Sequence, residues 1–461
     1  MFVHFWAGIC IFIRQTIELR ARAFSINRPK RNTDCSVRKL VGYQKRDHML
    51  RPMAASVNVN GFFIVTLVWI LASLVHCQDT SPSVEEYVEM KEYLATVNKP
   101  GVKTFTTEHG DTFDCVEIRK QPAFDNPLLK DHEIQLQPTS PPLGMKNKSS
   151  SYIAMKVGLP DEGCPAGTVP IRRVRMKELF RAGSVANYRS KYGRAGKNPL
   201  SQPGFIHQHA VLRLDTGGPY YGTEVGLNVW NPKVNEANGE SFSLAQLWVV
   251  NTTNPVNTIE AGWHVMPQIY NDAETHLFIY STANGYQTGC YNLGCGFVQV
   301  DPKISPGLSF TQVSSPGGTQ VEVKLSITRD ANNGNWWLGF EEVYTSNFVW
   351  VGYWPANLFN TLNNGADSIN WGGEVCIKTF PGTSYPAMGS GAWAYEEYGK
   401  AAYANNIKIV NSNNVLVDAP DNLVSQETLS SCFKVTDKGN NGAYFGRYFY
   451  FGGPGGQCPS P

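Results

Sequence analysis

Two glutamates occupy similar settings in the second half of the chain. In the segment IEAGWHV, Glu260 and Gly262 alternate with apolar residues, and in INWGGEVCI the same is true of Glu374 and Gly372. Alternation of this kind predicts strands whose successive side chains point to opposite faces. Each strand therefore carries one acid beside a glycine on the same face. Because glycine has no side chain, we expect Gly262 and Gly372 to leave room for a substrate backbone near the carboxylates.

Two carboxylates that meet in a partly dry site cannot both ionise easily, so their proton affinities separate. The ionised group can take a proton from water, while the protonated group stabilises an oxyanion and then protonates the leaving nitrogen. Such chemistry predicts better activity in acid than at neutral pH. The simpler interpretation is that each glutamate is an isolated strand acid that faces water. The sequence leaves open which of the two holds the proton.

Composition and patterning predict the fold that would position these residues. The chain has 461 residues, of which 42% are hydrophobic and 17% charged, with 43 glycines and 28 prolines. This length allows roughly two to three domains, and the net charge of +2 gives no sign of nucleic-acid binding. Short alternating runs such as VEVKLSIT are separated by Gly, Asn and Pro turns. We therefore expect a mainly β chain, with an antiparallel β-sandwich over residues 201–461.

The N-terminal region reads as a leader. Residues 1–48 are basic and disorganised, and we interpret them as an upstream extension. The run GFFIVTLVWILASLV suits the apolar part of a signal peptide spanning residues 49–77 and is short for a membrane span. The alternative is a signal anchor that keeps the basic N-terminus in the cytoplasm. We expect a secreted protein of the extracellular space, apoplast or cell wall, with the vacuole as a further possibility, and no stable membrane span.

Residues 78–200 are expected to form a small α/β module that precedes the sandwich. A capping box at Ser83–Glu86 predicts the start of a helix, which ends near Pro100. Residues 172–197 are strongly basic, with Glu178 as the only acid. Two interpretations remain open: a solvated helix followed by a loop, or an exposed, processable joint between a pro-segment and a catalytic domain.

Cysteines and sequons agree with secretion. Seven cysteines follow position 77, and an oxidising compartment would pair them. We predict the bridges Cys290–Cys295 and Cys432–Cys458, and at least one free thiol, for which Cys376 is our candidate. Asn147 and Asn251 begin sequons and are candidate glycosylation sites.

No metal site or cofactor is predicted. The chain contains no C-x-x-C pair. His207 and His209 share a strand face, but no third ligand is signalled nearby, so a core or surface histidine pair is favoured.

Long segments of the chain resemble the neprosin family. The resemblance is carried by IEAGWHVMPQIYND, TGCYNLGCGFVQV, GNWWLGF, NWGGEV, MGSGAW and FYFGGPGG in the second half, and by NKPGVKT, GDTFDCVEI, KQPAFDNPLLKDHEIQ and GCPAGTVPIRR in the first. These plant secreted proteins include an acid-acting endopeptidase specific for proline, with a pair of catalytic glutamates. The resemblance implies that Glu260 and Glu374 are the catalytic pair of a glutamic peptidase, and that residues 78–200 are an activation peptide that inhibits it in a zymogen. It also implies proline-containing peptide or protein substrates.

Several positions depart from the family pattern. Gln208 stands where a Glu is usual, His276 replaces an Arg, and Ser281 and Asn284 replace a Trp and an Asp. Both acids of the pair are retained, so these changes bear on substrate preference, rate and pH range.

Aromatic residues give a physical reason for a preference for proline, because rings stack well on pyrrolidine and on donor-poor extended chains. Most tryptophans of a sandwich belong to its core. We expect Trp263 and Trp371 to support the cleft near the glutamates. We also expect both acids to open on one cleft that the pro-segment can cover.

Other functions would use the same residues. A two-carboxylate glycoside hydrolase would use the same groups on a secreted sandwich. A non-catalytic cell-wall or carbohydrate-binding protein would use the glutamates for polar contacts only. A serine hydrolase is disfavoured, because the chain has no G-x-S-x-G segment.

Overall fold

The computed structural model describes residues 82–145, 159, 163–191, 205–234, 241–342, 347–378 and 384–458. All of them belong to the second of two compact units, Asp79–Pro461. The predicted upstream extension, the signal peptide, the sequon at Asn147 and residues 192–204 between module and sandwich lie outside the described residues. In the part that is described, no helix combines the length and the apolar character needed to cross a membrane.

The N-terminal module comprises the described residues from 82 to 191. Its first helix, α3, runs over Val84–Val97, and the predicted capping box is present: Ser83 and Glu86 each accept the backbone N–H of the other. Three antiparallel strands and two short helices follow: β1 (Lys103–Thr106), β2 (Thr112–Glu117), β3 (Thr168–Arg172), α4 (Met176–Ala182) and α5 (Val185–Arg189). A disulfide that the sequence analysis did not assign, Cys115–Cys164, closes this module.

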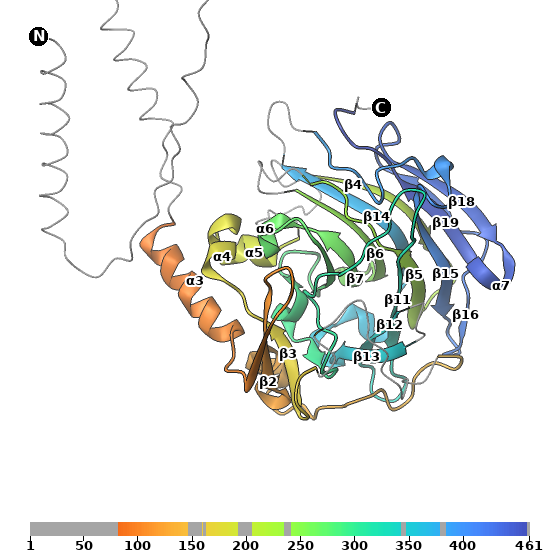
Figure 1. The fold of residues 1–461 in the computed structure, drawn as a ribbon. Helices are drawn as coiled ribbons and strands as arrows, with labels where there is room; N and C mark the ends of the chain where they lie inside the picture. Colours follow the sequence, from red (N-terminus) through yellow and green to blue (C-terminus); the bar gives the residue numbers. More distant parts are fainter. Residues whose placement is uncertain are drawn as a thin grey trace, which may run out of the picture. The chain divides into compact units, whose positions relative to one another are not determined.

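Two large antiparallel sheets form the body of the molecule (Figure 1). The seven-stranded sheet has the order β17-β4-β14-β6-β7-β8-β9, with strands β4 (Phe205–Leu214), β6 (Phe242–Asn251), β7 (Asn257–Val265), β8 (Thr275–Thr282), β9 (Cys290–Tyr291), β14 (Ser368–Lys378) and β17 (Val424–Glu427). The nine-stranded sheet has the order β10-β13-β12-β11-β5-β15-β19-β18, with β16 paired to β15; its strands are β5 (Gly222–Asn228), β10 (Val298–Gln299), β11 (Glu322–Arg329), β12 (Trp336–Glu342), β13 (Asn347–Trp354), β15 (Ala402–Val410), β16 (Leu416–Asp418), β18 (Lys434–Asn440) and β19 (Arg447–Gly452). The predicted mainly β fold with an antiparallel sandwich is confirmed.

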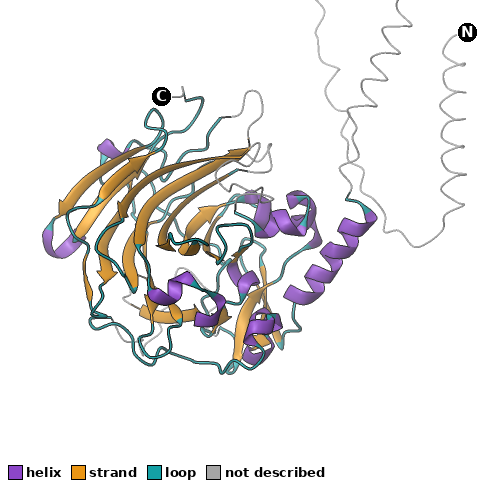
Figure 2. Cartoon of the chain, turned by 180° about the vertical axis from the view of Figure 1, so that it is seen from behind, coloured by secondary structure: helices purple, strands orange, loops and turns teal. Residues whose placement is uncertain are grey.

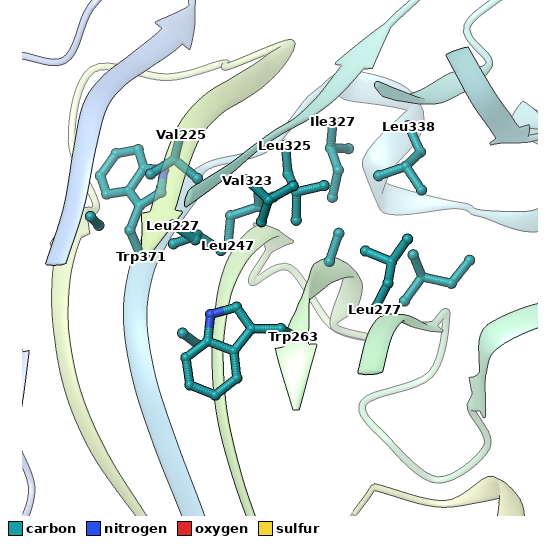
Figure 3. Packing of buried hydrophobic residues seen from close by; sticks show 14 of the residues in the cluster. Val225, Leu227, Leu247, Trp263, Leu277, Val323, Leu325, Ile327, Leu338 and Trp371 are labelled. Carbon is teal, nitrogen blue, oxygen red and sulfur yellow. The ribbon is translucent and has the colours of Figure 1, made fainter. Parts of the chain in front are cut away.

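The main core lies between the two sheets. Figure 3 shows Leu325 and Ile327 of β11 in the same cluster as Trp263 of β7 and Trp371 of β14. The predicted alternation in VEVKLSIT explains this, because period two sends every second residue of β11 into the core. Burial of apolar side chains from both sheets is the main source of stability for such a sandwich.

A second apolar cluster covers the outer face of the seven-stranded sheet, meaning the face turned away from the nine-stranded sheet. Met90 of α3, Leu179 of α4 and Tyr188 of α5 pack there with Trp248 of β6 and Phe278 of β8. In Figure 2 the helices of the N-terminal module lie together on one side of the strands. The short helix α6 (Pro267–Tyr270) contributes to the same cluster, and α7 (Gly442–Phe445) lies near the C-terminus. The N-terminal module is thus docked on this outer face.

As far as residue 191, Arg173 and Lys177 of the basic run are exposed, but much of the run fits neither of the two interpretations. Arg172 is buried and forms ion pairs with Asp111 and Glu178, so it is neither solvated nor exposed. Arg175 donates to the backbone carbonyl of Tyr270, which belongs to the sandwich. In the same way, Arg181 donates to the carbonyl of Pro267 and Arg189 to the sulfur of Cys290. Arg175, Arg181 and Arg189 thus hold the module on the sandwich, whereas the ion pairs of Arg172 and Arg173 lie within the module.

Candidate active site

Glu260 and Glu374 come together on the outer face of the seven-stranded sheet. Strand β6 lies between their strands: Glu374 of β14 is opposite Leu244, and Glu260 of β7 is opposite Trp248. Ile259 and Ala261, which flank Glu260, point into the main core, so the glutamate points outward. Both glutamate side chains are fully buried. This excludes the simpler interpretation in which each is an exposed strand acid.

A lysine of the N-terminal module joins the two acids. The Nζ atom of Lys191 lies 2.6 Å from Oε2 of Glu260 and 2.7 Å from Oε2 of Glu374, and its own side chain is fully buried. Lys191 follows α5 directly and also lies over the ring of Trp248, 5.5 Å from its centre. Burial by itself would lower the pKa of Lys191, but the two carboxylates outweigh that effect and raise it. The ammonium therefore stays charged where a substrate or water would meet the acids.

Three neutral donors surround Glu260. Tyr286 donates its hydroxyl to Oε1 at 2.7 Å, Thr258 donates to the same oxygen at 3.1 Å, and Gln246 donates from Nε2 to Oε2 at 2.8 Å. Burial, and then the neighbouring Glu260 carboxylate, raise the pKa of Tyr286 well above its ordinary value. The tyrosine thus remains a neutral hydrogen-bond donor at any physiological pH.

Glu374 is held by two histidines of β4. Nδ1 of His207 lies 2.7 Å from its Oε1, and Nε2 of His209 lies 3.7 Å from the same oxygen. Burial would raise the pKa of Glu374, but Lys191 first, then His209 and His207, outweigh burial and hold the pKa well below its ordinary value. Burial lowers the pKa of His209 to about 4. From the sequence, both histidines were expected to share one strand face as a core or surface pair; in the structure both face Glu374.

An open groove of about 430 Å³ lies beside the two acids on the outer face. Its walls include His207, Thr258 and Tyr286, which contact the carboxylates, so the groove is continuous with the site. Apolar and aromatic side chains form much of the remaining wall, among them Phe205, Val211, Trp248, Val250 and Val256. A groove with apolar walls and a few polar groups is typical of a site for an extended ligand.

The tryptophans and glycines named from the sequence lie outside the groove. Trp263 and Trp371 are fully buried in the main core, where they support the strands from behind and form no part of the groove (Figure 3). A Cβ at Gly262 would collide with the backbone carbonyl of Ala245 on β6, and one at Gly372 would collide with a backbone carbonyl of β4. The sheet itself requires these glycines, so the expectation that they leave room for a substrate is wrong. Trp248 is the tryptophan that lines the groove, and the sequence analysis did not name it.

The cysteines follow the prediction. The bonds Cys290–Cys295 and Cys432–Cys458 are present, and Cys376 is the buried cysteine outside any disulfide among the residues described.

Asn251, a predicted glycosylation site, is buried, and its side-chain nitrogen donates to the carbonyl of Gly365 at 2.8 Å. That nitrogen is the atom to which a glycan would be attached, so the folded chain does not suit glycosylation at Asn251.

One group of described residues has the composition of a metal site. Atoms of Asp111, Asp272 and His276 lie within 4.8 Å of one another. Arg172 already binds Asp111 at 2.8 Å, and both ring nitrogens of His276 face acceptors, the carbonyl of Gly307 and the carboxylate of Asp272, each at 2.9 Å. We interpret the group as an ion-pair network between the N-terminal module and the sandwich.

Comparison with known families agrees with this architecture. The model of the family described as Neprosin matches residues 239–454, and the model described as Neprosin activation peptide matches residues 104–213. A β-sandwich that follows an activation peptide is the class of protein that fold and site define. The chain belongs to the neprosin family.

Solved structures resemble this chain less closely than the two family models do. Scytalido-glutamic peptidase, in complex with a peptide-based transition-state analogue, is 11% identical over 54% of this chain and 98% of its own, with a TM-score of 0.27. SCP-B, a member of the eqolisin family of peptidases in complex with the tripeptide Ala-Ile-His, gives the same identity and coverage and a TM-score of 0.26. The enzymatically active domain of bacteriophage CBA120 tailspike protein 2 is 13% identical over 49% of this chain and 31% of its own, with a TM-score of 0.22. These TM-scores are too low to support an argument about this chain.

Proposed function

We propose that this chain is a secreted glutamic endopeptidase, made as a zymogen, in which Glu260 and Glu374 activate water in acid. The observation that carries the proposal is the Lys191 ammonium, which lies within hydrogen-bond distance of both buried carboxylates. A cation from an activation peptide at that point keeps both acids ionised and excludes substrate. Three disulfides support the oxidising compartment that secretion would provide.

The hydrogen bonds suggest different roles for the two acids. Apart from Lys191, no described donor reaches Oε2 of Glu374, so removal of the lysine leaves this oxygen free to accept a proton from water. Glu260 is surrounded by the hydroxyls of Tyr286 and Thr258, which can accept as well as donate and so tolerate a protonated carboxyl group. We therefore assign Glu374 as the base and Glu260 as the acid.

The proposed reaction follows from these roles. Glu374 takes a proton from a water molecule that attacks the scissile carbonyl carbon. Protonated Glu260 donates to the developing oxyanion, with Nε2 of Gln246 beside it as a second donor, and then protonates the leaving nitrogen. Preorganised donors in a dry site cost little reorganisation when charge develops, which is why such groups accelerate acyl transfer.

We further propose that the peptidase prefers substrates that contain proline. The groove next to the acids presents Trp248 and Tyr286, whose rings suit stacking on pyrrolidine. Proline-rich chains are extended and poor in donors, so a groove with largely apolar walls loses little by binding them.

Maturation would cut the chain between residues 192 and 204. The activation-peptide model extends to residue 213, but β4 begins at Phe205 and pairs with both β14 and β17 inside the seven-stranded sheet. Cleavage beyond Phe205 would remove part of this strand, and cleavage beyond His209 would also remove both histidines that contact Glu374.

The test is to replace each acid with its isosteric amide. We expect Glu260→Gln and Glu374→Gln each to reduce cleavage of a proline-containing peptide at acid pH by at least about 100-fold, because each removes one half of the proton transfer. Glu322→Gln serves as a control, since Glu322 is also buried but lies on β11 of the other sheet.

Unchanged peptide cleavage in either variant would refute the pair. Wall glycans are tested as substrates in the same assay. Cleavage of glycans that depends on both glutamates, without cleavage of peptides, would instead identify a glycoside hydrolase on this sandwich.

A further inference from the structure

A cysteine that belongs to no disulfide lies beside the glutamate pair. Cys376 follows Glu374 by two residues on β14, so both side chains are on the outer face of the sheet. Its Sγ lies 3.3 Å from Nε2 of His207, whose Nδ1 lies 2.7 Å from Oε1 of Glu374. Every other cysteine in the described part of the chain belongs to a disulfide.

The hydrogen bonds fix the direction in which a proton can move. An ionised Glu374 can only accept, so Nδ1 of His207 carries the hydrogen, and the tautomer with its single hydrogen there presents a lone pair at Nε2. That lone pair faces the thiol of Cys376. A nucleophile, a base within reach of it and a third group that orients the base make up the arrangement found around activated nucleophiles.

We propose that Cys376 is an activated thiol that forms a mixed disulfide with a low-molecular-weight disulfide once the N-terminal module has left, and that this adduct disables the glutamate pair. The effect on the pair depends on the proposed function, whereas the modification itself does not. In the reaction, Nε2 of His207 takes the thiol proton and the thiolate attacks one sulfur of the small disulfide. A new S–S bond forms to Cys376, the old one breaks, and the other half leaves as a thiol that carries the proton away.

Burial explains why the module would control this chemistry. Cys376 is 2% exposed and belongs to the same outer cluster as Leu179, Val185 and Tyr188 of the N-terminal module. His207 lines the open groove, so the base already borders a cavity while its thiol partner is covered. An adduct on Sγ needs space on the outer face and would push His207 away from Glu374, which removes a donor from the proposed base.

The test measures modification by intact mass, before and after an added protease cuts the chain between residues 192 and 204 and the module is removed in acid, with oxidised glutathione as the probe at neutral pH. We expect one adduct on the matured protein and none on the full-length chain. Cys376→Ala should show no adduct; Cys376→Ser serves as a second variant if Ala does not fold. His207→Gln, which can still donate to Glu374 but is not a base, should react at least about tenfold more slowly. Glu322→Gln, on β11 of the other sheet of the sandwich, should react like the parent.

Three results would overturn the proposal: an equal adduct on Cys376→Ala, no adduct on the matured parent, or an unchanged rate in His207→Gln. Cleavage of a proline-containing peptide is measured on the same samples. The adduct should reduce it, and Cys376→Ala should cleave normally and resist the probe; full activity of the modified parent would also overturn the proposal. Because the mass measurement does not depend on cleavage, a failure of the proposed function would appear separately, as unchanged cleavage in Glu260→Gln.

Discussion

At the scale of single residues, the site depends on one cation between two anions. Taking three charges out of water is costly, and their mutual attraction compensates only while all three are present. Besides the two carboxylates, Lys191 contacts the ring of Trp248, whereas each glutamate keeps hydrogen-bond partners of its own. The lysine is therefore the component whose loss leaves uncompensated charge.

We expect Lys191→Met to lower the free energy of unfolding of the full-length chain by about 3–5 kcal/mol at pH 7, the usual cost of breaking a buried ion pair. The loss should be smaller near pH 4, where a glutamate can take up a proton in place of the ammonium. Urea unfolding at both pH values measures this difference. Lys400→Met is the matched control, because Lys400 pairs with Glu396 at the surface and surface pairs contribute little.

An equal loss at both pH values would show that the lysine stabilises the chain by packing and not by charge. A second readout is latency, since the variant should cleave peptide before maturation, which Lys400→Met should not do.

Residue types alone revealed part of this site. Alternation placed Glu260 and Glu374 on strand faces, and resemblance to the family paired them. Lys191 could not be found in this way, because it stands in a basic run that is typical of a solvated surface. Gln246 and Trp248 were also missed; they sit in the apolar run FSLAQLWVV, and only the register of β6 with β7 shows that they share a face with Glu260.

At the scale of elements, β14 is the strand on which the arrangement depends. It pairs with β4 along its whole length and with β6 on its other side, so its residues reach both the histidines and the strand next to Glu260. Sequence periodicity predicted this strand but not its neighbours, because period two fixes faces and says nothing about which strands pair. Gly372 of β14 and Gly262 of β7 were accordingly misread as space for substrate.

A substitution at Gly372 tests whether the sheet itself requires this glycine. Its φ of 138° and the collision of a Cβ with the backbone of β4 predict that Gly372→Ala destabilises the chain by about 1–3 kcal/mol or more. Gly399→Ala is a matched control, since Gly399 also has a positive φ, of 81°, but nothing lies within 4 Å of its Cβ position. Thermal unfolding of the two variants measures the difference. Equal melting temperatures would mean that β14 can move away from β4, and the space interpretation would return.

At the scale of the whole molecule, the N-terminal module and the sandwich meet over one continuous face. Apolar side chains of α3, α4 and α5 cover the outer cluster, arginines of the basic run donate to the sandwich, and Lys191 closes the site. The polar contacts respond to pH while the apolar ones do not. The balance between the closed and open forms should therefore be set by the ionisable groups around Glu374.

Acid should open the zymogen, and the sign follows from two groups. The pKa of Glu374 in the closed form is held below its ordinary value of 4.5, so its contribution is present above pH 4.5 and is lost as pH falls through the lowered pKa. The pKa of His209 is lowered from 6.5 to about 4, so the closed form becomes progressively less favourable between pH 6.5 and 4 if opening lets water reach the imidazole. Lys191 stays charged throughout, because its pKa is raised. Dissociation of the module after a cut between residues 192 and 204, followed by gel filtration from pH 7 to pH 3.5, should begin below about pH 6.5 and continue to increase below pH 4.5. In His209→Gln the upper part of the transition should disappear while the part below pH 4.5 remains. Dissociation that is independent of pH, or that increases toward neutrality, would show that the ionisable groups around Glu374 do not hold the molecule closed.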